Sequence, residues 1–403
     1  MKAKRPGSLK PSTRETARVV WLPGDGVGPE VVREARRVVE RAAELAGLEL
    51  ESREYPCGGR YWLQTGKEWP DEAFPACRDW ADAVLLGAVG WPGATLPNGD
   101  LAGGGVLFGL RFGLDLYANV RPAKLFPGIP HRVCGAFRVV WPPESVDMVL
   151  IRENTEGCYA PVHGQLTRGG TSEVAVDSRI ITRKGAERVI RHAFELARER
   201  QGAPGDGKRR VTCIDKANVM AGCRLFRGVF DEVALAYPDI ATEHIYVDAF
   251  MQALVRQPEH FDVGVTTNMM GDIATDLAAV LQGGMGVAPS GEIGDRHAMF
   301  EGVHGSAPDI AGKGIANPLA AILSGAMMLD WIGCRKGSAA WRGAGAAIET
   351  AVRAMVAAGE GLSPDIGGTE GTSAVGDAVL RRLAGEARRA SSSSARRPRR
   401  RRA

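Results

Sequence analysis

The feature that most constrains the fold is an alternation of short apolar segments with longer amphipathic ones along nearly the whole chain. Apolar, strand-like segments occur at 17–24, 81–90, 146–151, 211–220 and 261–268. Segments with apolar residues at helical spacing occur at 28–47, 103–120, 182–200, 223–237 and 271–281. Because parallel strands need a crossover that is usually helical, this order predicts an α/β fold with a largely parallel sheet.

Positive charge is concentrated at the C-terminus. The formal charge of the chain is +4, and residues 391–403 contain six arginines and no acid, so residues 1–390 carry a formal −2. A nearly neutral body argues against a specific nucleic-acid partner. The low-complexity tail is expected to be disordered and solvated, and weak contact with RNA, DNA or anionic surfaces is the alternative.

The cysteines and the hydropathy pattern bear on the cellular compartment. Seven cysteines, an odd number with no CxxC pair, argue against a disulfide framework or a zinc site and suit a reducing compartment. The basic N-terminus has no apolar core of a secretory signal, and no run of about 18 apolar residues suggests a membrane span. We therefore expect a soluble, cytoplasmic protein without a membrane partner.

Three aspartates lie close to the ends of strand-like segments. Asp272 and Asp276 are four positions apart, so a helix places both on one face, where like charges repel. Asp248 directly follows another short strand-like segment. Oxygen ligands that converge on one point suit Mg²⁺ or Mn²⁺. The spacing alone also fits two acids in the first turn of a helix, where the helix dipole favours them.

Three arginines and two further polar residues suggest an anionic substrate. Arg111, Arg121 and Arg152 lie at or near the ends of predicted elements, and guanidinium groups bind carboxylates bidentately. Together they predict a small di- or tricarboxylate beside the metal, although any one alone is more often a surface residue. Lys216 follows a strand and is a candidate base, and Tyr159 is a candidate proton donor. Each of these two, taken alone, is more often structural.

A loop rich in glycine and small residues, 300–318, suggests a cofactor site because backbone can approach a flat or charged ligand there. Asp309 in this loop is suited to accept a hydrogen bond from a ribose 2′-hydroxyl and to repel a 2′-phosphate, which favours NAD over NADP. Near the N-terminus, Gly24 and Gly26 fit the start of a dinucleotide-binding fingerprint, but Pro29 stands at its third glycine. No Rossmann domain is therefore inferred.

Together these motifs resemble the metal-dependent β-decarboxylating dehydrogenases, which include isopropylmalate, isocitrate, homoisocitrate and tartrate dehydrogenases. The matching stretches, between about Ala17 and about Leu383, are PGDGVGPEV, LLGAVG, LRFGLDLYANVRPAKLFPG, RENTEG, KANV, FDVGVTTNMMGDIATDLAA and GVHGSAPDIAGKGIANP. The resemblance implies an isopropylmalate-dehydrogenase-like, non-Rossmann α/β fold with two domains, an active site in the interdomain cleft and at least a homodimer. It divides the chain into a disordered tail (1–17), a large cofactor-binding domain (18–116 and 283–390), a small domain with the substrate and metal residues and the dimer interface (117–282), and a disordered arginine-rich tail (391–403).

The resemblance also implies a role for each candidate residue. The carboxylates of the malate substrate are bound by Arg111, Arg121 and Arg152. The cation, Mg²⁺ or Mn²⁺, is bound by Asp272 and Asp276 of one subunit and Asp248 of the other. The catalytic residues are Lys216, which also comes from the partner, Asp248 and Tyr159. NAD is bound by Glu301, His304, Gly305, Asp309, Ile310 and Asn317, and NADP-preferring members usually have lysine where Asp309 stands.

The substrates of such enzymes differ in the substituent on malate C3, which meets the helix before Arg111. Leu107 and Phe108 form an apolar pair there, which favours 3-isopropylmalate. Isocitrate enzymes place serine and asparagine at Gly105 and Leu107, and homoisocitrate enzymes place arginine at Phe108. However, RENTEG and LLGAVGWPG are typical of isocitrate, homoisocitrate or tartrate members, and the triple glycine 103–105 exposes amides suited to an anion. These substrates, or a phosphonate-bearing malate, are therefore alternatives.

A function of a different class is a non-catalytic regulatory subunit or an RNA-binding relative that uses the arginine-rich tail. Regulatory relatives of this family tend to lose the metal aspartates or the lysine. This chain retains them all, which favours an enzyme.

Overall fold

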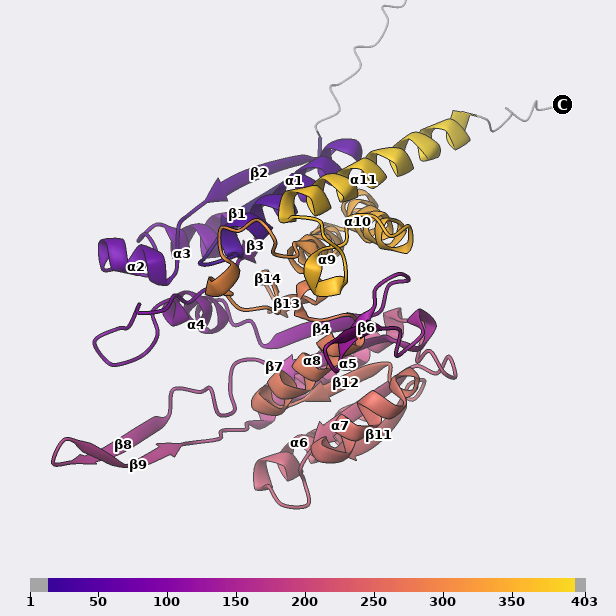
Figure 1. The fold of residues 1–403 in the computed structure, drawn as a ribbon. Coiled ribbons are helices and arrows are strands. Elements are labelled where there is room, and N and C mark those ends of the chain that lie inside the picture. Colours follow the sequence, from indigo (N-terminus) through magenta and orange to yellow (C-terminus); the bar gives the residue numbers. More distant parts are fainter. Residues whose placement is uncertain (1–13, 396–403) are drawn as a thin grey trace, which may run out of the picture.

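The structure, a computed structural model, describes residues 14–395, in which strands and helices alternate (Figure 1). The first part of the chain forms β1 (Thr16–Leu22), α1 (Gly28–Leu45), β2 (Glu49–Glu54), α2 (Gly59–Thr65), α3 (Ala73–Pro75), β3 (Ala83–Leu86) and α4 (Gly104–Gly113). The middle part forms β4 (Ala118–Lys124), β5 (His131–Val133), β6 (Ala136–Arg138), β7 (Asp147–Glu153), β8 (His163–Arg168), β9 (Thr171–Asp177), α5 (Arg183–Glu199), β10 (Arg210–Asp215), α6 (Ala221–Ala234), β11 (Ala241–Tyr246), α7 (Val247–Arg256), β12 (Val263–Thr266) and α8 (Asn268–Leu281). The last part forms β13 (Pro289–Ile293), β14 (Ala298–Gly302), α9 (Leu319–Lys336), α10 (Ala339–Ala357) and α11 (Thr372–Ala395).

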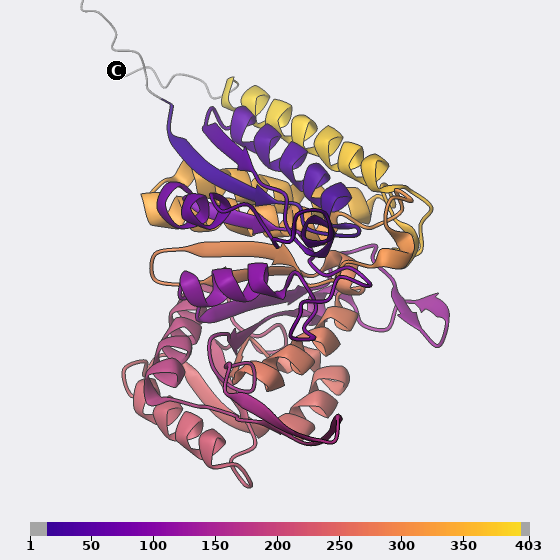
Figure 2. The ribbon, with the colours of Figure 1, turned by 90° about the vertical axis from the view of Figure 1, so that its left-hand side faces the viewer.

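A ten-stranded sheet runs through the whole molecule in the order β11-β10-β12-β7-β4-β13-β14-β3-β1-β2. The strands toward both ends of this order pair in parallel, whereas β7–β4, β4–β13 and β13–β14 pair antiparallel. The predicted α/β fold with a largely parallel sheet is thus confirmed. Strands from the middle of the chain form one half of the sheet and strands from its two ends form the other, and they meet at β4 and β13. Helix α4 lies along this junction (Figures 1 and 2).

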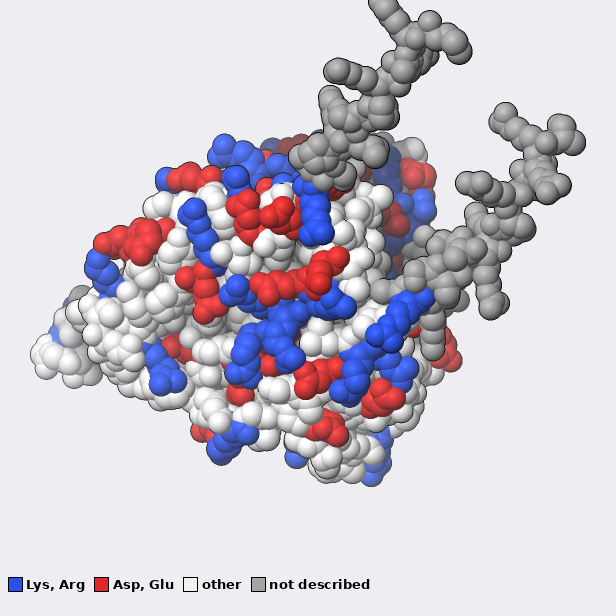
Figure 3. All heavy atoms as spheres, turned by 90° about the horizontal axis from the view of Figure 1, so that it is seen from above, with Lys and Arg blue, Asp and Glu red and all other residues white. Residues whose placement is uncertain are grey.

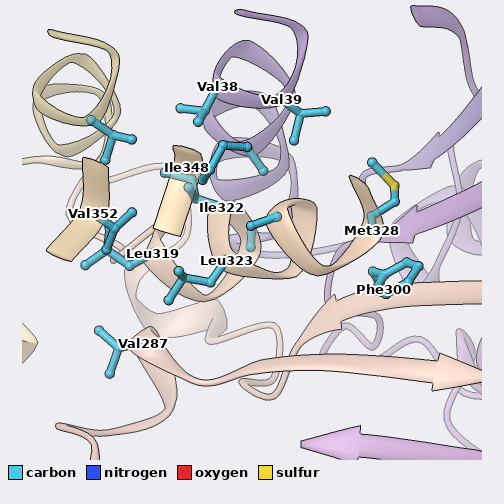
Figure 4. Close-up of a cluster of buried hydrophobic side chains, with 14 of the residues drawn as sticks. Val38, Val39, Val287, Phe300, Leu319, Ile322, Leu323, Met328, Ile348 and Val352 are labelled. Atoms are coloured by element: carbon cyan, nitrogen blue, oxygen red, sulfur yellow. The ribbon is translucent and has the colours of Figure 1, made fainter. Parts of the chain in front are cut away.

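Helices cover both faces of the sheet because alternate strand residues are buried on opposite sides. In β7, for example, Leu150 belongs to the larger apolar cluster and Val149 and Ile151 to a second one, with helices α5 and α6. The larger cluster is centred on α1, α9 and α10. Figure 4 shows Val38 and Val39 of α1 facing Ile322 of α9 there.

Two hairpins leave the main sheet. Strands β8 and β9 pair only with each other, and every residue in both is exposed. In Figure 1 this arm projects away from the body. Strands β5 and β6 form a second, shorter hairpin.

Several predicted boundaries were wrong. The helix predicted at 103–120 ends at Gly113, because Asp115 adopts a positive φ of 52° that breaks the helix before β4 begins. Helix α8 begins at Asn268 and has no acid in its first turn, so Asp272 and Asp276 are not first-turn residues. Strand β1 begins at Thr16 and α11 ends at Ala395, so regular structure extends into both tails predicted to be disordered. Residues 1–13 and 396–403, with the tail's six arginines, lie outside the described part of the chain.

The surface carries both signs of charge. Figure 3 shows lysine and arginine interspersed with aspartate and glutamate on the face seen from above. Ion pairs join α1 to its neighbours, with 2.6 Å between Arg37 and Asp377 and 3.1 Å between Arg36 and Glu54. Within residues 14–395, none of the helices is long and apolar enough to cross a membrane.

Candidate active site

Two strands and one helix bring four of the predicted residues together. Arg121 on β4 and Arg152 on β7 both face the aspartates of α8. Nη1 of Arg121 lies 3.6 Å from Oδ1 of Asp272 and 3.5 Å from Oδ1 of Asp276, and Arg152 forms an ion pair with Asp272. Gly271 allows α8 this close to β7, because a Cβ there would lie 2.7 Å from Cβ of Arg152. The repulsion between the two aspartates is thus partly offset by arginines of the same chain.

Tyr159 joins this cluster from the loop after β7. Its hydroxyl donates to Oδ2 of Asp272 at 3.0 Å, and the guanidinium carbon of Arg152 lies 5.3 Å from the centroid of its ring. Burial and the nearby Asp272 raise the pKa of Tyr159, so the phenol keeps its proton at neutral pH. Asn268, which sequence reasoning missed, accepts from Nε and Nη2 of Arg152 at 3.0 and 2.7 Å. The result is a proton-bearing phenol beside a fixed arginine.

Burial affects Arg152 strongly as well. The side chain is 2% exposed, and burial followed by the positive charge of Arg121 lowers the pKa of Arg152 to about 10. The guanidinium therefore remains charged at neutral pH. It lies in surroundings where a further anion is favourable.

Arg111, the third predicted arginine, is held by a carboxylate that sequence reasoning missed. Glu292 on β13 is completely buried and accepts from Nε of Arg111 at 3.0 Å and from Nη2 at 2.5 Å. Asn154 and Asn119 also donate to Glu292, at 3.1 and 3.2 Å. Burial alone would raise the pKa of Glu292, but the charge and hydrogen bonds of Arg111 outweigh burial and lower it. The signal in the sequence is a charged residue within the buried strand PSGEI, whose other residues are uncharged.

Glu301 lies near the same arginine. Its Oε1 is 3.6 Å from Nη2 of Arg111, and 14% of its side chain is exposed. Burial, followed by the negative charge of Glu292, raises the pKa of Glu301 to about 8. Glu301 is therefore mostly protonated at neutral pH. This places one predicted cofactor residue beside the arginine cluster.

Lys216 and Asp248 form a separate pair. Nζ of Lys216, after β10, lies 2.5 Å from Oδ1 of Asp248 at the start of α7. The hydrogen bond from Lys216 lowers the pKa of Asp248, whose side chain is 66% exposed. Across residues 14–395, no group of three acidic, histidine or cysteine side chains is placed to hold a metal ion. A single chain thus brings Asp272 to Asp276 and Lys216 to Asp248, but it does not bring the three aspartates together.

The aspartate pair of α8 nevertheless suits a hard divalent cation. Side chains of Asp272 and Asp276 are 34% and 57% exposed, and burial and the charge of Asp272 raise the pKa of Asp276. A cation would relieve that repulsion, and carboxylate oxygens are the ligands that Mg²⁺ and Mn²⁺ prefer. The chain therefore supplies two ligands of a site that needs others.

Helix α4 presents the predicted substrate-selective residues. Phe108 is 37% exposed, and its ring centroid lies 5.8 Å from the guanidinium carbon of Arg111. The amides of Gly103 and Gly105 at the start of this helix are not free, although the sequence had suggested the triple glycine as an anion site. Glu68, another residue that was missed, accepts from the amides of Gly103 at 2.5 Å and Gly105 at 3.0 Å.

The glycine-rich loop borders a cavity of about 320 Å³. Its lining includes three of the predicted cofactor residues, His304, Ile310 and Asn317. Nε2 of His304 is buried without a hydrogen-bond partner, and burial lowers the pKa of His304, so a neutral imidazole is available to a ligand. Gly305 and Asp309 are exposed on the same loop and do not line the cavity. The pocket has the size and the polar group expected for part of a nucleotide.

Sequence reasoning missed two residues of this cavity. Asp365, in the turn before α11, accepts from Nδ2 of Asn317 at 3.0 Å, and Arg132 reaches the cavity from β5. The segment PGDGVG, rejected as a fingerprint, supports the loop instead, because the amide of Val27 donates to the carbonyl of Ser306 at 2.9 Å. These contacts join segments that are far apart in sequence, so no local pattern reveals them.

Comparisons with known proteins agree on one enzyme family. A family model described as isocitrate/isopropylmalate dehydrogenase matches residues 18–379. The 3-isopropylmalate dehydrogenase of Thermobifida fusca is 42% identical, over 92% of this chain and 98% of that protein, and the one of Aquifex aeolicus is 42% identical over 78% and 83%. Among solved structures, isocitrate dehydrogenase from Methylococcus capsulatus has a TM-score of 0.78 and 37% identity, covering 91% of this chain and 99% of that one. A β-decarboxylating dehydrogenase from Thermococcus kodakarensis has a TM-score of 0.70 and 36% identity, covering 95% and 99%.

Proposed function

The chain belongs to the isocitrate/isopropylmalate dehydrogenase family and is a decarboxylating dehydrogenase of hydroxy acids, and on this premise we propose that it oxidatively decarboxylates a 3-isopropylmalate-like substrate with NAD and Mg²⁺ or Mn²⁺. The observation that carries the proposal is the convergence of Arg121 and Arg152 on the aspartates of α8, beside the apolar Phe108 and Arg111 of α4. Such an arrangement offers cationic groups for two carboxylates and an apolar surface for a third substituent.

Different residues of this site would carry out different steps of the reaction. The arginines would bind the two malate carboxylates and orient C2, which makes the reacting geometry reproducible. Lys216 would take the proton of the C2 hydroxyl after passing its own proton to Asp248 or to water. Tyr159, which retains its proton at neutral pH, would return a proton to the substrate carbon after CO₂ leaves. When bound, NAD would accept the hydride, and the divalent cation would polarise the C2 oxygen and favour decarboxylation.

We propose that the active site is shared between two subunits. Lys216 and Asp248 are paired with each other rather than with the aspartates of α8. Exposed apolar side chains such as Ile273 on α8 and Val176 on the β8–β9 arm supply surface for a partner. The exposed Val219 lies on the same turn as Lys216, with its amide donating to the carbonyl of Lys216 at 3.1 Å. If Lys216 enters the partner's cleft, Val219 adds an apolar contact there.

NAD rather than NADP is proposed as the cofactor. Asp309 is exposed on the loop that borders the nucleotide-sized cavity, where its charge would repel a 2′-phosphate. Substituting Asp309 with lysine should raise kcat/KM for NADP relative to NAD. An unchanged ratio would show that Asp309 does not face the ribose.

Isocitrate is the second candidate substrate, because the similar solved structure from Methylococcus capsulatus is an isocitrate dehydrogenase. Homoisocitrate, tartrate and phosphonate-bearing malates complete the panel that must be tested. Steady-state NADH formation with Mn²⁺ should give the highest kcat/KM for 3-isopropylmalate. A preference for any of the other substrates, or no turnover of any malate, would refute this assignment.

A further inference from the structure

Glu292 limits the part of the Arg111 guanidinium that a substrate can contact, and it neutralises the charge of Arg111. It occupies the fork formed by Nε and Nη2, at 3.0 and 2.5 Å, and it is completely buried. A substrate carboxylate can therefore reach only the remaining edge of the guanidinium, around Nη1. It also meets an ion pair of zero net charge instead of a free cation. Arg111 is thus suited to orient a carboxylate, but it adds little net positive charge to the cleft.

The charges around the cleft are balanced. Three arginines face three carboxylates, those of Glu292, Asp272 and Asp276. Glu301 does not change the balance, because its raised pKa of about 8 keeps it mostly protonated at neutral pH. A divalent cation and the two carboxylates of a malate add equal and opposite charges. A third carboxylate on C3 would add one further negative charge to this partly buried site, which is unfavourable.

Glu68 occupies the other position suited to an anionic substituent, the N-terminus of α4. The N-terminus of α4 carries partial positive charge and free amides, which normally attract anions. Here Glu68 accepts from the amides of Gly103 and Gly105, and its approach depends on glycine, because a Cβ on Gly105 would lie 2.0 Å from Oε2 of Glu68. The next turn of the helix presents Leu107 and Phe108. The helix therefore offers the substituent an apolar surface and a carboxylate that repels anions.

We infer that Glu292 is a specificity-determining residue that, assisted by Glu68, makes the enzyme select malates with an uncharged C3 substituent and reject those with an anionic one. This inference rests on the proposed function, since it concerns the substituent of that substrate. The selection acts mainly by excluding the wrong substrate, because neither carboxylate adds an attractive contact to an apolar group.

The test compares two substrates in each variant. Wild-type enzyme and the variants Glu292→Gln, Glu292→Asp and Glu68→Gln are assayed with 3-isopropylmalate and isocitrate, with Mn²⁺ and NAD. Removing the charge in Glu292→Gln should raise the ratio of kcat/KM for isocitrate over 3-isopropylmalate by about tenfold, because one charge pair is lost in a partly desolvated site. Glu68→Gln should raise it by about threefold, because Glu68 is nearer to solvent. Glu292→Asp keeps the charge and should keep the ratio, even if both rates fall.

Matched variants show whether the effect is specific to the cleft. Glu34 is also buried and paired with arginines, but it lies on α1 against α11, and Glu72 is an exposed neighbour of Glu68. The ratio should be unchanged in Glu34→Gln and Glu72→Gln. A ratio in Glu292→Gln that equals that of Glu34→Gln, or a shift in Glu292→Asp as large as in Glu292→Gln, would overturn the inference.

Calorimetry separates failure of the inference from failure of the proposed function. Mn²⁺-loaded wild-type and Glu292→Gln proteins are titrated with the same two malates. If no malate yields NADH, the proposed function fails, but the ratio of the two Kd values still shows whether Glu292 selects against the third carboxylate. A wild-type preference for isocitrate in both assays would overturn the inference and leave the family reaction intact.

Discussion

The two groups of predicted polar residues differ in how completely one chain satisfies their charges. The cluster of Arg111, Arg152 and Glu292 is buried, and its charges are paired within the chain. In the pair of Lys216 and Asp248, the side chains are 27% and 66% exposed, and the ring centroid of Tyr246 lies 5.7 Å from Nζ of Lys216. The first group is preorganised to bind an anion, whereas the second forms an ion pair apart from it. The difference supports the proposal that one chain binds the substrate and that a second chain supplies Lys216 and Asp248.

The largest effect is expected at Asp272, which forms an ion pair with Arg152 of the first group. Asp272→Asn should reduce kcat at least about a hundredfold, because it removes a ligand of the cation and the acceptor of Tyr159. Chelation of divalent cations should have the same effect in the wild type, measured by NADH formation and CO₂ release. Activity that survives both treatments would remove the metal from the reaction. The control variant is Asp71→Asn, because Asp71 is 81% exposed and its ion pair is with Lys67.

Substitutions in the two groups should also differ in how much they destabilise the folded protein. Glu292→Ala leaves the guanidinium of Arg111 buried without its partner, which should cost about 3–5 kcal/mol of unfolding free energy in urea denaturation. Asp248→Ala removes the partly exposed ion pair with Lys216 and should leave the midpoint of urea denaturation unchanged within error. Equal losses in the two variants would contradict the contrast between a preorganised and an open group.

Mixing two inactive variants tests whether the groups meet across a subunit interface. Lys216→Ala and Asp272→Asn enzymes, co-refolded in equal amounts, should regain up to about a quarter of wild-type activity, because a mixed dimer contains one intact site. Each variant refolded alone provides the control. Absence of recovery in dimers that are shown to mix would place both groups of one site in the same chain.

The smallest expected effect comes from Glu301. Its pKa is raised from 4.5 to about 8 by burial and by Glu292, so the folded state binds a proton that the unfolded state releases. The stabilisation is complete below about pH 4.5, and it is lost as the pH rises through about 8. The melting temperature of wild type should therefore fall by a few degrees relative to Glu301→Gln between these values. Parallel pH curves for the two proteins would show that Glu301 does not titrate in this way.

Much of the fold and part of the cleft could be predicted from the sequence, because local patterns carry them. The spacing of apolar residues predicts strands such as β10 and helices such as α5, and the aspartates four positions apart share a helical face wherever α8 is placed. The predicted helix at 103–120 was too long because apolar residues continue past Asp115, and only the backbone conformation there ends it. The assignment of metal, cofactor and partner roles to the site residues remains a prediction.

The amino-acid sequence by itself determined the α/β class, the family, and the presence of arginines and carboxylates suited to a hydroxy acid. Only the tertiary structure showed that Glu292 neutralises Arg111 and that Glu68 covers the amides of α4. The physical reason is that each contact joins residues 35 to 181 positions apart. Periodicity describes which face of an element is buried, but the partner of a buried charge depends on which elements the sheet places side by side.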